Sequence, residues 1–530
     1  MSIATLIGGL GFVGAASADV IVGTGVPSGT TLGATTATTL QINNGGIGHQ
    51  LIQPYFNVQN GNATLISIVN TDTVNGKAVK VRFRGASNSD DILDFTLLMS
   101  PGDVWTGTIT AGTGTATASI VTNDRTCTLP QLLAGVPQPF VTNRLTTKSG
   151  NDLSNNTREG YIELFNMADI QITSALGKTI LHSAGVPKCD PTVINPAILN
   201  TNYTTEAPAA AAGLATPTTG IFGDWAIINV PQTTTYSGEM VALRALSSVN
   251  PQIDGRGNFV LFPQSAAAYP GVINAVTADP LFRTDSVTNK PQGGGGTLAT
   301  GLPAIAAAFF DMPDMSTPYT APGGVSTGPN EQASELTAAL AVNSIINTYA
   351  TEPSISAKTD WVFSMPTRRY SVSMDYTPAT SRRLFSQVGV GIVAGSGNQW
   401  FFDGNTPINT FNAQQICVSA QNQTYQDREE GLKTSGAVFS PGNITVTQFC
   451  GEVSVQSFND GGISVLGATV ARQNIDGASI FTNGWGVVNV FNGVTGLPIT
   501  GSAFQKATNP AASPGFAGTY GLSFAHRFTR

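Results

Sequence analysis

Short segments in which apolar side chains occupy every second position recur along this chain. The clearest covers residues 77–84 (KAVKVRFR), where Val79, Val81 and Phe83 share one face and basic residues occupy the other. Residues 93–99 repeat the period with Leu, Phe, Leu and Met. Because consecutive side chains of a strand point to opposite faces of a sheet, this period indicates β-strands and is incompatible with an amphipathic helix.

Similar segments predict about seven strands in the first part of the chain. The dipeptides Asn60-Gly61 and Asn75-Gly76, typical of tight hairpin turns, separate some of them. Strands at such spacing predict an Ig-like β-sandwich over residues 49–195. The remaining strand segments are 51–58, 64–71, 103–110, 116–122 and 161–166.

The following region, residues 196–358, has a different composition and is predicted to be mostly irregular. Within it, residues 331–349 place Leu336 and Leu340 at helical spacing behind Asn330, a favourable N-cap residue. One helix over 331–349 is therefore expected, and it does not make this an α/β protein.

The β pattern returns in residues 359–530, which are predicted to form a second β-rich domain. The predicted fold class is mainly β, with two β-rich regions and one or a few helices between them. The final predicted strand carries alternating large side chains: Tyr520, Leu522, Phe524, His526 and Phe528.

Charged residues make up only 11% of the chain, against about 25% in an ordinary soluble domain. The formal net charge is −7, and the basic residues form no cluster, so the electrostatic signature of nucleic-acid binding is absent. A polar surface with few charges is weakly protected against association. This composition favours a protein that packs against copies of itself.

Residues 1–18 are predicted to be a signal peptide. Residues 6–15 form a short apolar run, and Ala16-Ser17-Ala18 matches an A-x-A cleavage site. Residues 9–14 also match the G-x-G-x-x-G pattern of dinucleotide-binding proteins. That site needs a following helix and an acidic residue about 20 positions on, whereas Thr- and Gly-rich sequence follows here. Export is therefore the favoured interpretation.

Four cysteines in an exported chain indicate disulfides, and none of them shows the C-x-x-C spacing of a metal site. Four cysteines allow three connectivities. We favour Cys127–Cys189 and Cys417–Cys450, because each pair then lies within one half of the chain.

Several segments resemble a group of secreted proteobacterial surface proteins, known as surface-layer or extracellular-matrix proteins. The resemblance implies export and a structural role, and it supplies no catalytic residues. The segments are 64–72 (TLISIVNTD), 77–105 (KAVKVRFRGASNSDDILDFTLLMSPGDVW), 159–170 (EGYIELFNMADI), 223–231 (GDWAIINVP), 359–370 (TDWVFSMPTRRY) and 519–527 (TYGLSFAHR).

A cluster of side-chain oxygens is the best ligand candidate in the sequence. Calcium binds six to eight oxygens, and closely spaced Asp and Asn residues provide them, although the EF-hand order is absent. The predicted calcium ligands are Asn88, Asp90, Asp91, Asp94 and Asp103. No other cofactor is expected.

Two further patterns are not interpreted as catalytic. Residues 324–328 match G-x-S-x-G, but a Pro-rich stretch precedes them and Pro329 follows, which does not fit the strand–turn–helix of a nucleophile elbow. The three histidines, His49, His182 and His526, are scattered and belong to no recognisable motif. We therefore predict no catalytic residues and no enzymatic activity.

The sequence thus predicts a self-assembling structural protein of the bacterial cell surface, either a surface-layer or an extracellular filament subunit. Its expected partners are other copies of itself and cell-envelope polysaccharide or lipopolysaccharide. The Gly/Thr-rich segment 19–48 is predicted to be an extended arm. Its residues Val20, Ile21 and Val22 would pair with the sheet edge of a neighbouring subunit.

Two alternatives stay open from the sequence. An outer-membrane β-barrel suits the alternating final strand, although many predicted strands are shorter than the ~9–11 residues that a membrane span needs. A secreted glycan-binding protein would use aromatic rings to stack on sugars, and Trp400, Phe401 and Phe402 beside Asp403 are the best such group.

Overall fold

The computed structural model describes the larger part of the chain after residue 18. The described residues are 19–142, 145, 153–199, 203–247, 254–261, 315, 317–321, 329–375, 382–385, 400–408, 415–434, 447–459, 461, 464–477, 480–513 and 516–530. The predicted signal peptide (1–18) and the patterns at residues 9–14 and 324–328 lie outside them. The fold is mainly β, as predicted.

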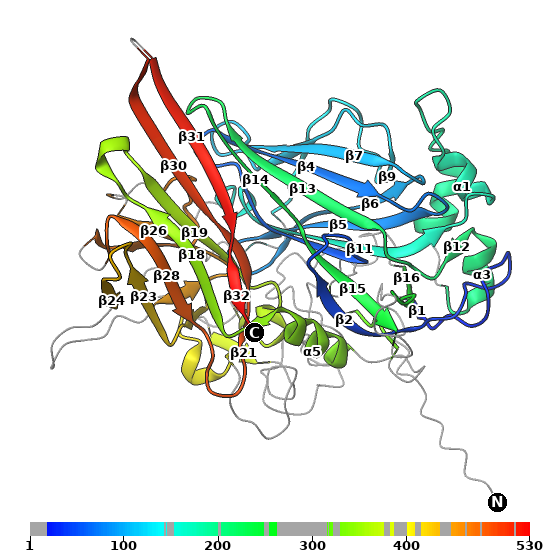
Figure 1. The fold of residues 1–530 in the computed structure, drawn as a ribbon. Helices are drawn as coiled ribbons and strands as arrows, with labels where there is room; N and C mark the ends of the chain where they lie inside the picture. The colour runs from blue at the N-terminus through cyan, green and yellow to red at the C-terminus, as the bar shows by residue number, and fades with distance from the viewer. Residues whose placement is uncertain are drawn as a thin grey trace, which may run out of the picture.

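The first half of the molecule is a sandwich of two antiparallel sheets (Figure 1). The six-stranded sheet has the order β10 (Gln138–Pro139), β8 (Ser119–Val121), β7 (Val104–Thr110), β4 (Asn62–Asn70), β13 (Ile221–Asn229) and β14 (Thr234–Glu239). The eight-stranded sheet has the order β2 (Ala37–Asn43), β15 (Val241–Ser247), β3 (Gln50–Asn57), β11 (Glu159–Ile170), β5 (Gly76–Gly85), β6 (Asp91–Met99) and β9 (Cys127–Leu129), with β12 (Leu214–Ala215) paired to β11.

Burial differs between the two sheets. Along β4, buried side chains alternate with more exposed ones, as expected when one face of a strand packs on the core. By contrast, β5 and β11 are buried at every position. These two strands lie side by side in the middle of the larger sheet, so both faces of that sheet are covered at its centre.

The N-terminal sandwich extends beyond the predicted range of 49–195. Strands β13, β14 and β15 come from the region predicted to be irregular, and β2 comes from the predicted arm. Each pairs with a strand far away in the sequence, for example β2 with β15. A local pattern cannot reveal such a partner, and the boundaries set from local patterns were therefore wrong.

The predicted arm is not free in this structure. β1 (Asp19–Ile21) pairs antiparallel with β16 (Phe259–Leu261), with Val20 opposite Val260. Ile21 is buried and belongs to the main hydrophobic core. The structure thus pairs Val20 and Ile21 with a strand of the same chain, and contact of Val20, Ile21 and Val22 with a neighbouring subunit stays a prediction.

The second half is another sandwich of two five-stranded sheets. One has the order β24 (Leu432–Thr434), β23 (Asn422–Gln426), β28 (Asn483–Asn489), β18 (Ser344–Ala350) and β32 (Arg527–Thr529). The other has the order β27 (Arg472–Ile475), β26 (Val453–Phe458), β19 (Lys358–Ser364), β30 (Thr500–Ser513) and β31 (Phe516–Ala525). All neighbours are antiparallel except β26 and β27, which are parallel.

Smaller elements complete the described structure. Three strand pairs are β17 (Ala341–Val342) with β29 (Leu497–Pro498), β20 (Val372–Asp375) with β21 (Arg382–Phe385), and β22 (Cys417–Ser419) with β25 (Gln448–Cys450). The short helices α1 (Ala175–Ile180), α2 (Pro191–Ile194) and α3 (Glu206–Ala211) lie together at one end of the first sandwich (Figure 1). Single helical turns occur at Asn155–Thr157, Asn195–Leu199, Pro353–Ile355, Arg368–Tyr370 and Asp403–Asn405.

The predicted helix 331–349 is shorter than expected. Helix α5 spans Pro329–Leu340, and the chain then enters β17 and β18. In β18, Ile345 and Tyr349 enter the core of the second sandwich. The second half of this prediction was wrong, because residues after Leu340 are rich in β-branched side chains and their strand partners stabilise the extended form. No helix among the described residues is long and apolar enough to cross a membrane.

The hydrophobic core of the first sandwich continues into the second half, which also has a core of its own. Phe504 of β30 packs among three aromatic side chains of the first half. Its ring centroid lies 6.2 Å from that of Tyr55, 5.8 Å from that of Trp225 and 5.5 Å from that of Tyr236. The halves are therefore joined by a packed interface rather than by a loose linker.

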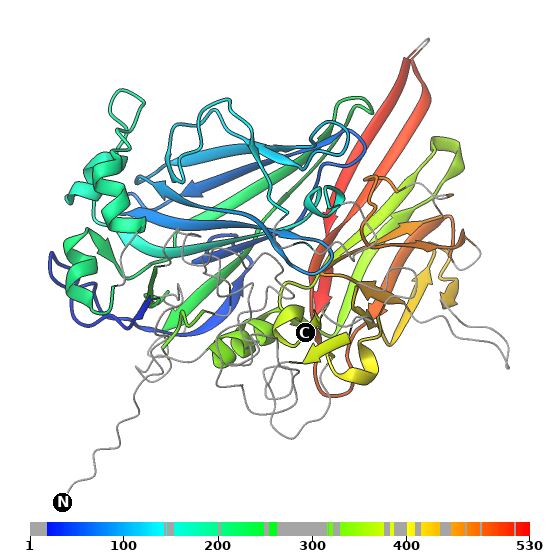
Figure 2. The same cartoon turned by 180° about the vertical axis from the view of Figure 1, so that it is seen from behind.

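The hairpin of β30 and β31 extends beyond the body of the molecule in both views (Figures 1 and 2). Near its base, β31 lies beside β14, where Ser237 N donates to Ser523 Oγ at 3.1 Å. Toward the tip, residues 509–513 of β30 are exposed. The outer part of this hairpin thus stands clear of the sandwich beside it.

Candidate functional site

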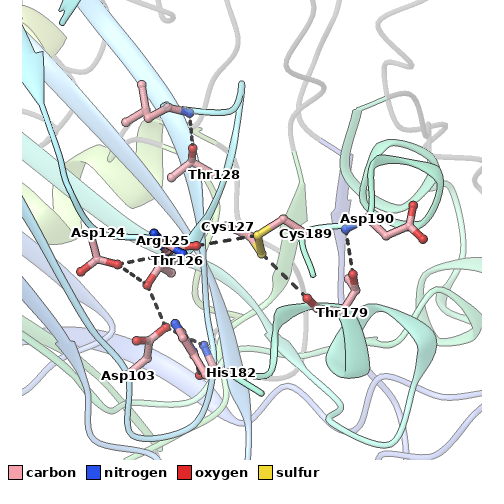
Figure 3. Close-up of a disulfide and its surroundings, with 12 residues drawn as sticks. Asp103, Asp124, Arg125, Thr126, Cys127, Thr128, Thr179, His182, Cys189 and Asp190 are labelled. Carbon is pink, nitrogen blue, oxygen red and sulfur yellow. Dashed lines mark hydrogen bonds between the residues drawn. A yellow bond between two sulfur atoms is a disulfide. The ribbon is translucent and has the colours of Figure 1, made fainter. Parts of the chain in front are cut away.

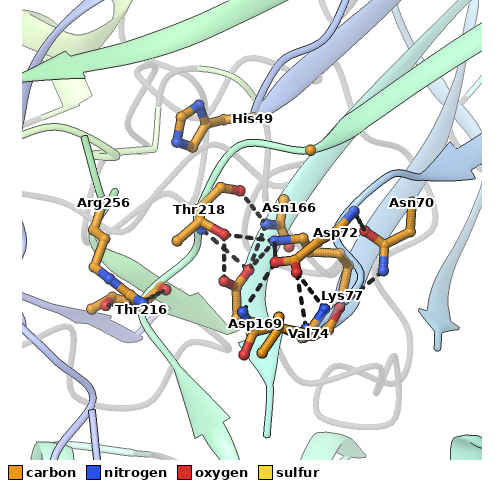
Figure 4. A network of polar contacts seen from close by, with 12 residues as sticks. His49, Asn70, Asp72, Val74, Lys77, Asn166, Asp169, Thr216, Thr218 and Arg256 are labelled. Carbon is orange, nitrogen blue, oxygen red and sulfur yellow. Dashed lines mark hydrogen bonds and ion pairs between the residues drawn. The ribbon is translucent and has the colours of Figure 1, made fainter. Parts of the chain in front are cut away.

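A buried ionic network links β5 and β11 at one end of the eight-stranded sheet (Figure 4). Lys77 Nζ lies 2.8 Å from Asp169 Oδ1, 3.1 Å from Asp72 Oδ2 and 2.7 Å from Thr218 Oγ1. The side chains of Lys77 and Asp169 are 0% and 1% exposed. Because an isolated buried charge is very costly, a network this complete holds both strands in one register.

Asp169 receives several hydrogen bonds besides its contact with Lys77. Its Oδ1 accepts from Asn166 Nδ2 at 3.1 Å and from Thr218 N at 3.1 Å. Its Oδ2 accepts from Thr218 Oγ1 at 2.5 Å. A β-bulge between Asn166 and Ala168 sets the register in which Asp169 lies directly opposite Lys77.

Asp72 lies in the turn before β5 and closes the network on the solvent side. Its side chain is 16% exposed, and it accepts hydrogen bonds from the backbone N–H groups of Val74 and Asn75. Burial acts to raise the pKa of Asp72. The hydrogen bonds from Asn75 and the charge of Lys77 outweigh burial and lower this pKa to about 2.

His49 is a buried neighbour of the network (Figure 4). Its Nε2 lies 2.9 Å from Gly255 O, and its Nδ1 lies 3.1 Å from Ala245 N. A carbonyl only accepts and a backbone N–H only donates, so the ring is the neutral tautomer with the proton on Nε2. Burial lowers the pKa of His49 to about 4. This histidine therefore stays uncharged at neutral pH.

A second group of charges lies on the opposite face of the same strands. Three of the four basic residues of β5 face away from the apolar side chains, as predicted, but they are buried and ion-paired, whereas Lys77 lies on the same face as Val79. The three pairs are Lys80 with Asp94 (2.7 Å), Arg82 with Asp91 (3.0 Å) and Arg84 with Glu163 (3.0 Å).

The second half of the molecule contributes to this charged group. Arg368 pairs with Glu452 at 3.0 Å, and both side chains are at most 1% exposed. The backbone N–H of Glu452 donates to Ala86 O, just after β5. Burial raises the pKa of Glu452, and the neighbouring Arg368 opposes that shift. The two halves therefore meet at a polar contact as well as in the shared apolar core.

The predicted calcium ligands do not converge on one point. Asp91 and Asp94 are ion-paired with Arg82 and Lys80, and Asp103 accepts hydrogen bonds from Ser100 N and Thr126 Oγ1. Asn88 and Asp90 belong to the turn between β5 and β6. Within the described part of the chain, no three His, Cys, Asp or Glu side chains are placed to hold a metal. The sequence missed this because cationic partners on the adjacent strand use the same carboxylates.

Both predicted disulfides are confirmed. Cys127 of β9 is bonded to Cys189, which attaches the edge of the eight-stranded sheet to the helical end of the sandwich (Figure 3). Cys417 of β22 is bonded to Cys450, its direct partner on β25. Each bond lies within one half of the molecule.

A serine and a histidine approach each other near the first disulfide. Ser100 Oγ lies 3.2 Å from His182 Nδ1, and Asp103 is close to the same ring (Figure 3). A catalytic triad needs the carboxylate on the second ring nitrogen. Among the described residues, no hydrogen bond to that nitrogen of His182 is present, and the arrangement lacks the geometry of a triad.

The aromatic group at residues 400–402 is mostly core. Trp400 and Phe401 are 1% and 4% exposed, and Trp400 Nε1 donates to Thr495 O at 3.0 Å. Only Phe402 is well exposed, at 44%. Because two of the three rings are packed inside, this group does not form a stacking platform for sugars.

No protein-family model, curated protein or solved structure matches this chain. The resemblance to secreted surface proteins therefore stays a prediction from the sequence. The site is interpreted from its own geometry.

The acidic partners on β11 and the whole Lys77 network were not predicted from the sequence. One signal was present: residues 159–170 carry Glu159, Glu163 and Asp169 within a segment otherwise typical of a buried strand. Acidic residues in one buried strand and basic residues in another indicate ion pairing between neighbouring strands.

Proposed function

We propose that this chain is a secreted structural protein of the bacterial cell surface that assembles with copies of itself. The observation that carries the proposal is the outer edge of β31. In the described structure, β31 pairs only with β30 along its length, and its outer part lies beyond the neighbouring β14. Such an edge presents unpaired backbone groups to another chain.

The sequence of this edge supports association. Soluble proteins protect long edge strands with charged residues, prolines or bulges. The ten residues of β31 (FAGTYGLSFA) include no charged residue and no proline. Two of its large side chains, Tyr520 and Leu522, are 58% and 52% exposed. A second copy offers matching edges, since backbone pairing makes little demand on sequence.

Two further observations agree with a secreted structural role. Disulfides persist in oxidising compartments outside the cytosol, and this chain holds two of them. The low charge content also leaves little electrostatic repulsion between copies.

A shortened hairpin tests the proposal. Asn509 and Gly518 are direct partners in the hairpin. Deleting residues 510–517 joins Asn509 directly to Gly518, and this Asn-Gly pair becomes the hairpin turn. The deletion removes the projecting tip and keeps the contact with β14. We expect this variant to fold with unchanged stability and to lose assembly, measured by sedimentation velocity and electron microscopy.

Point substitutions provide a matched control. Tyr520→Ser removes an exposed ring from the edge strand, whereas Val26→Ser changes a residue that is 81% exposed elsewhere. The first should weaken assembly and the second should not. Wild-type protein that stays monomeric at high concentration, or a shortened variant that assembles normally, would overturn the proposal.

A further inference from the structure

We propose that Lys77 and Asp169 become joined by an amide bond between Nζ and Cγ, which forms an intramolecular isopeptide cross-link between β5 and β11. The inference does not depend on assembly, because it concerns chemistry inside one folded chain. It rests on the arrangement of three residues, Asp72, Asn166 and Thr218, around the buried ion pair shown in Figure 4.

The amine is already placed against the carboxyl group. Lys77 Nζ lies 2.8 Å from Asp169 Oδ1, so the carboxyl carbon is one carbon–oxygen bond beyond the contact. The two residues are direct partners in the antiparallel ladder. Since the strand pairing holds both groups in place, the reaction proceeds without loss of translational freedom, which accelerates intramolecular acyl transfer by many orders of magnitude.

The donors around Asp169 suit a tetrahedral intermediate. Thr218 N and Asn166 Nδ2 each donate to Oδ1 at 3.1 Å, and together they stabilise the negative charge that develops on this oxygen. Neither donor needs to move, because both already contact the ground-state carboxylate.

The proton path is also present. Lys77 Nζ donates to Thr218 Oγ1 at 2.7 Å, and this hydroxyl donates to Asp169 Oδ2 at 2.5 Å. Thr218 thus relays a proton from the amine to the leaving oxygen. The second proton follows the same route through Thr218 as the intermediate breaks down, while Asp72 Oδ2, 3.1 Å from Nζ, orients the amine.

The reaction balances without any added reagent. The ammonium of Lys77 and the carboxylate of Asp169 give one amide and one water. The Nζ–Cγ bond forms, the Cγ–Oδ2 bond breaks, and two of the three ammonium protons leave with Oδ2. Charge is conserved, because the positive and negative partners disappear together.

Burial favours the product over the ion pair. The Lys77 and Asp169 side chains are at most 1% exposed, so little water reaches the amide to reverse the reaction. Cross-linking also removes two buried charges, whose desolvation is costly. Asp72 and Thr218 are only partly buried, which leaves a route by which the released water can depart.

Peptide mapping of the folded wild-type chain tests the proposal. After reduction of the disulfides and proteolysis, we expect the peptides that contain Lys77 and Asp169 to appear as one branched species, lighter than their sum by one water. The intact mass should be lower by one water than the mass calculated for a chain that starts at the measured N-terminus. Lys80→Arg is the matched control, since it alters another buried lysine of β5 and should retain the cross-link.

Variants at the acyl position sharpen the test. Asp169→Asn should still react but release ammonia instead of water, so the mass falls by one ammonia. Asp169→Ala and Lys77→Arg should give the full sequence mass. If the folded wild-type protein contains two separate linear peptides, or if the mass loss maps to a succinimide at Asn75-Gly76, the contact is an ion pair only and the proposal is wrong. The wild-type result decides even where a variant fails to fold.

Discussion

The two sandwiches cover their central strands with different side chains. In the first, β11 carries Glu163 and Asp169, which are paired with basic residues of β5 and are nearly inaccessible to solvent. In the second, β19 carries Trp361 and Phe363, both fully buried in an aromatic core. The buried carboxylate of β19, Asp360, accepts hydrogen bonds from the neutral groups Ser464 Oγ and Leu466 N.

This difference separates stability from specificity. Aromatic rings stabilise a core by burying large areas in almost any register that fills the space. Buried ion pairs contribute little net stability, but a one-residue slip would separate every charge from its partner. We infer that the charges of the first sandwich fix the register in which β5 pairs with β11. The rings of the second sandwich mainly stabilise the folded state.

Truncating one fully buried side chain of either kind should have the largest effect. Glu163→Ala leaves Arg84 without its carboxylate, and the free energy of unfolding should fall by about 3–5 kcal/mol, measured by urea denaturation. Trp361→Ala should cost a similar amount, about 3–5 kcal/mol, through the cavity it leaves. The control, Glu239→Ala on the exposed face of β14, should change stability by less than about 0.5 kcal/mol.

The paired replacement distinguishes the two kinds of core. Arg84→Met combined with Glu163→Leu replaces the ion pair with apolar side chains, and stability should return to the wild-type value or exceed it. Trp361 has no charged partner, so no second substitution of this kind should restore the stability of Trp361→Ala. A double variant as unstable as Glu163→Ala would show that the charges stabilise the first sandwich directly.

The disulfides test whether the halves unfold together. They span 62 and 33 residues, and in the chain-entropy model each contributes about 4 kcal/mol. We expect calorimetry to show one transition, because the core of the first sandwich continues into the second half. Replacing either cysteine pair with alanines should lower the midpoint temperature of that transition. Two separate transitions, of which each variant shifts only one, would contradict the shared core.

Each sandwich contains a buried histidine that should make its stability sensitive to acid. His526 in the second half resembles His49, with Nε2 3.0 Å from Val362 O and Nδ1 2.9 Å from Asn347 Nδ2. Burial lowers the pKa of His526 to about 3 and that of His49 to about 4, both from 6.5. In each case the unfolded chain binds a proton more readily, so stability is complete above pH 6.5 and is lost as the pH falls toward the lowered value.

The expected loss is on the order of 3 kcal/mol per histidine between pH 7 and pH 4. The free energy of unfolding, measured with urea at each pH, should fall less steeply with decreasing pH for His49→Gln and for His526→Gln than for the wild type. Asp254, Asp169 and Lys77 act on His49 but are unchanged in its variant, so the difference isolates the imidazole. Equal slopes would mean that the histidines are solvated in the folded state.

Much of the fold was predictable because its local patterns are strong. Alternation at residues 77–84 and 93–99 predicted β5 and β6, and proximity along the chain predicted both disulfides. The boundaries failed where pairing is long-range, as between Val20 and Val260. Helix α5 was extended too far because the apolar spacing of the preceding turns continues by chance into a strand.

The candidate site was less predictable for a physical reason. A basic residue opposite an apolar face of a strand usually faces water, and only a second covering layer makes it buried. The sequence gives no direct sign of that layer. The same ambiguity misassigned Asp91 and Asp94 to calcium, since a carboxylate suits a cation of either kind.

The place of Phe504 in the shared core has a consequence for synthesis. During translation, the aromatic rings of Tyr55, Trp225 and Tyr236 emerge long before residue 504 arrives to cover them. Until then the first sandwich exposes an apolar surface, and such surfaces promote aggregation of incomplete chains. A fragment that ends before β30 should therefore need a chaperone to stay in solution. In the complete chain, the second half covers this surface and the chaperone is no longer needed.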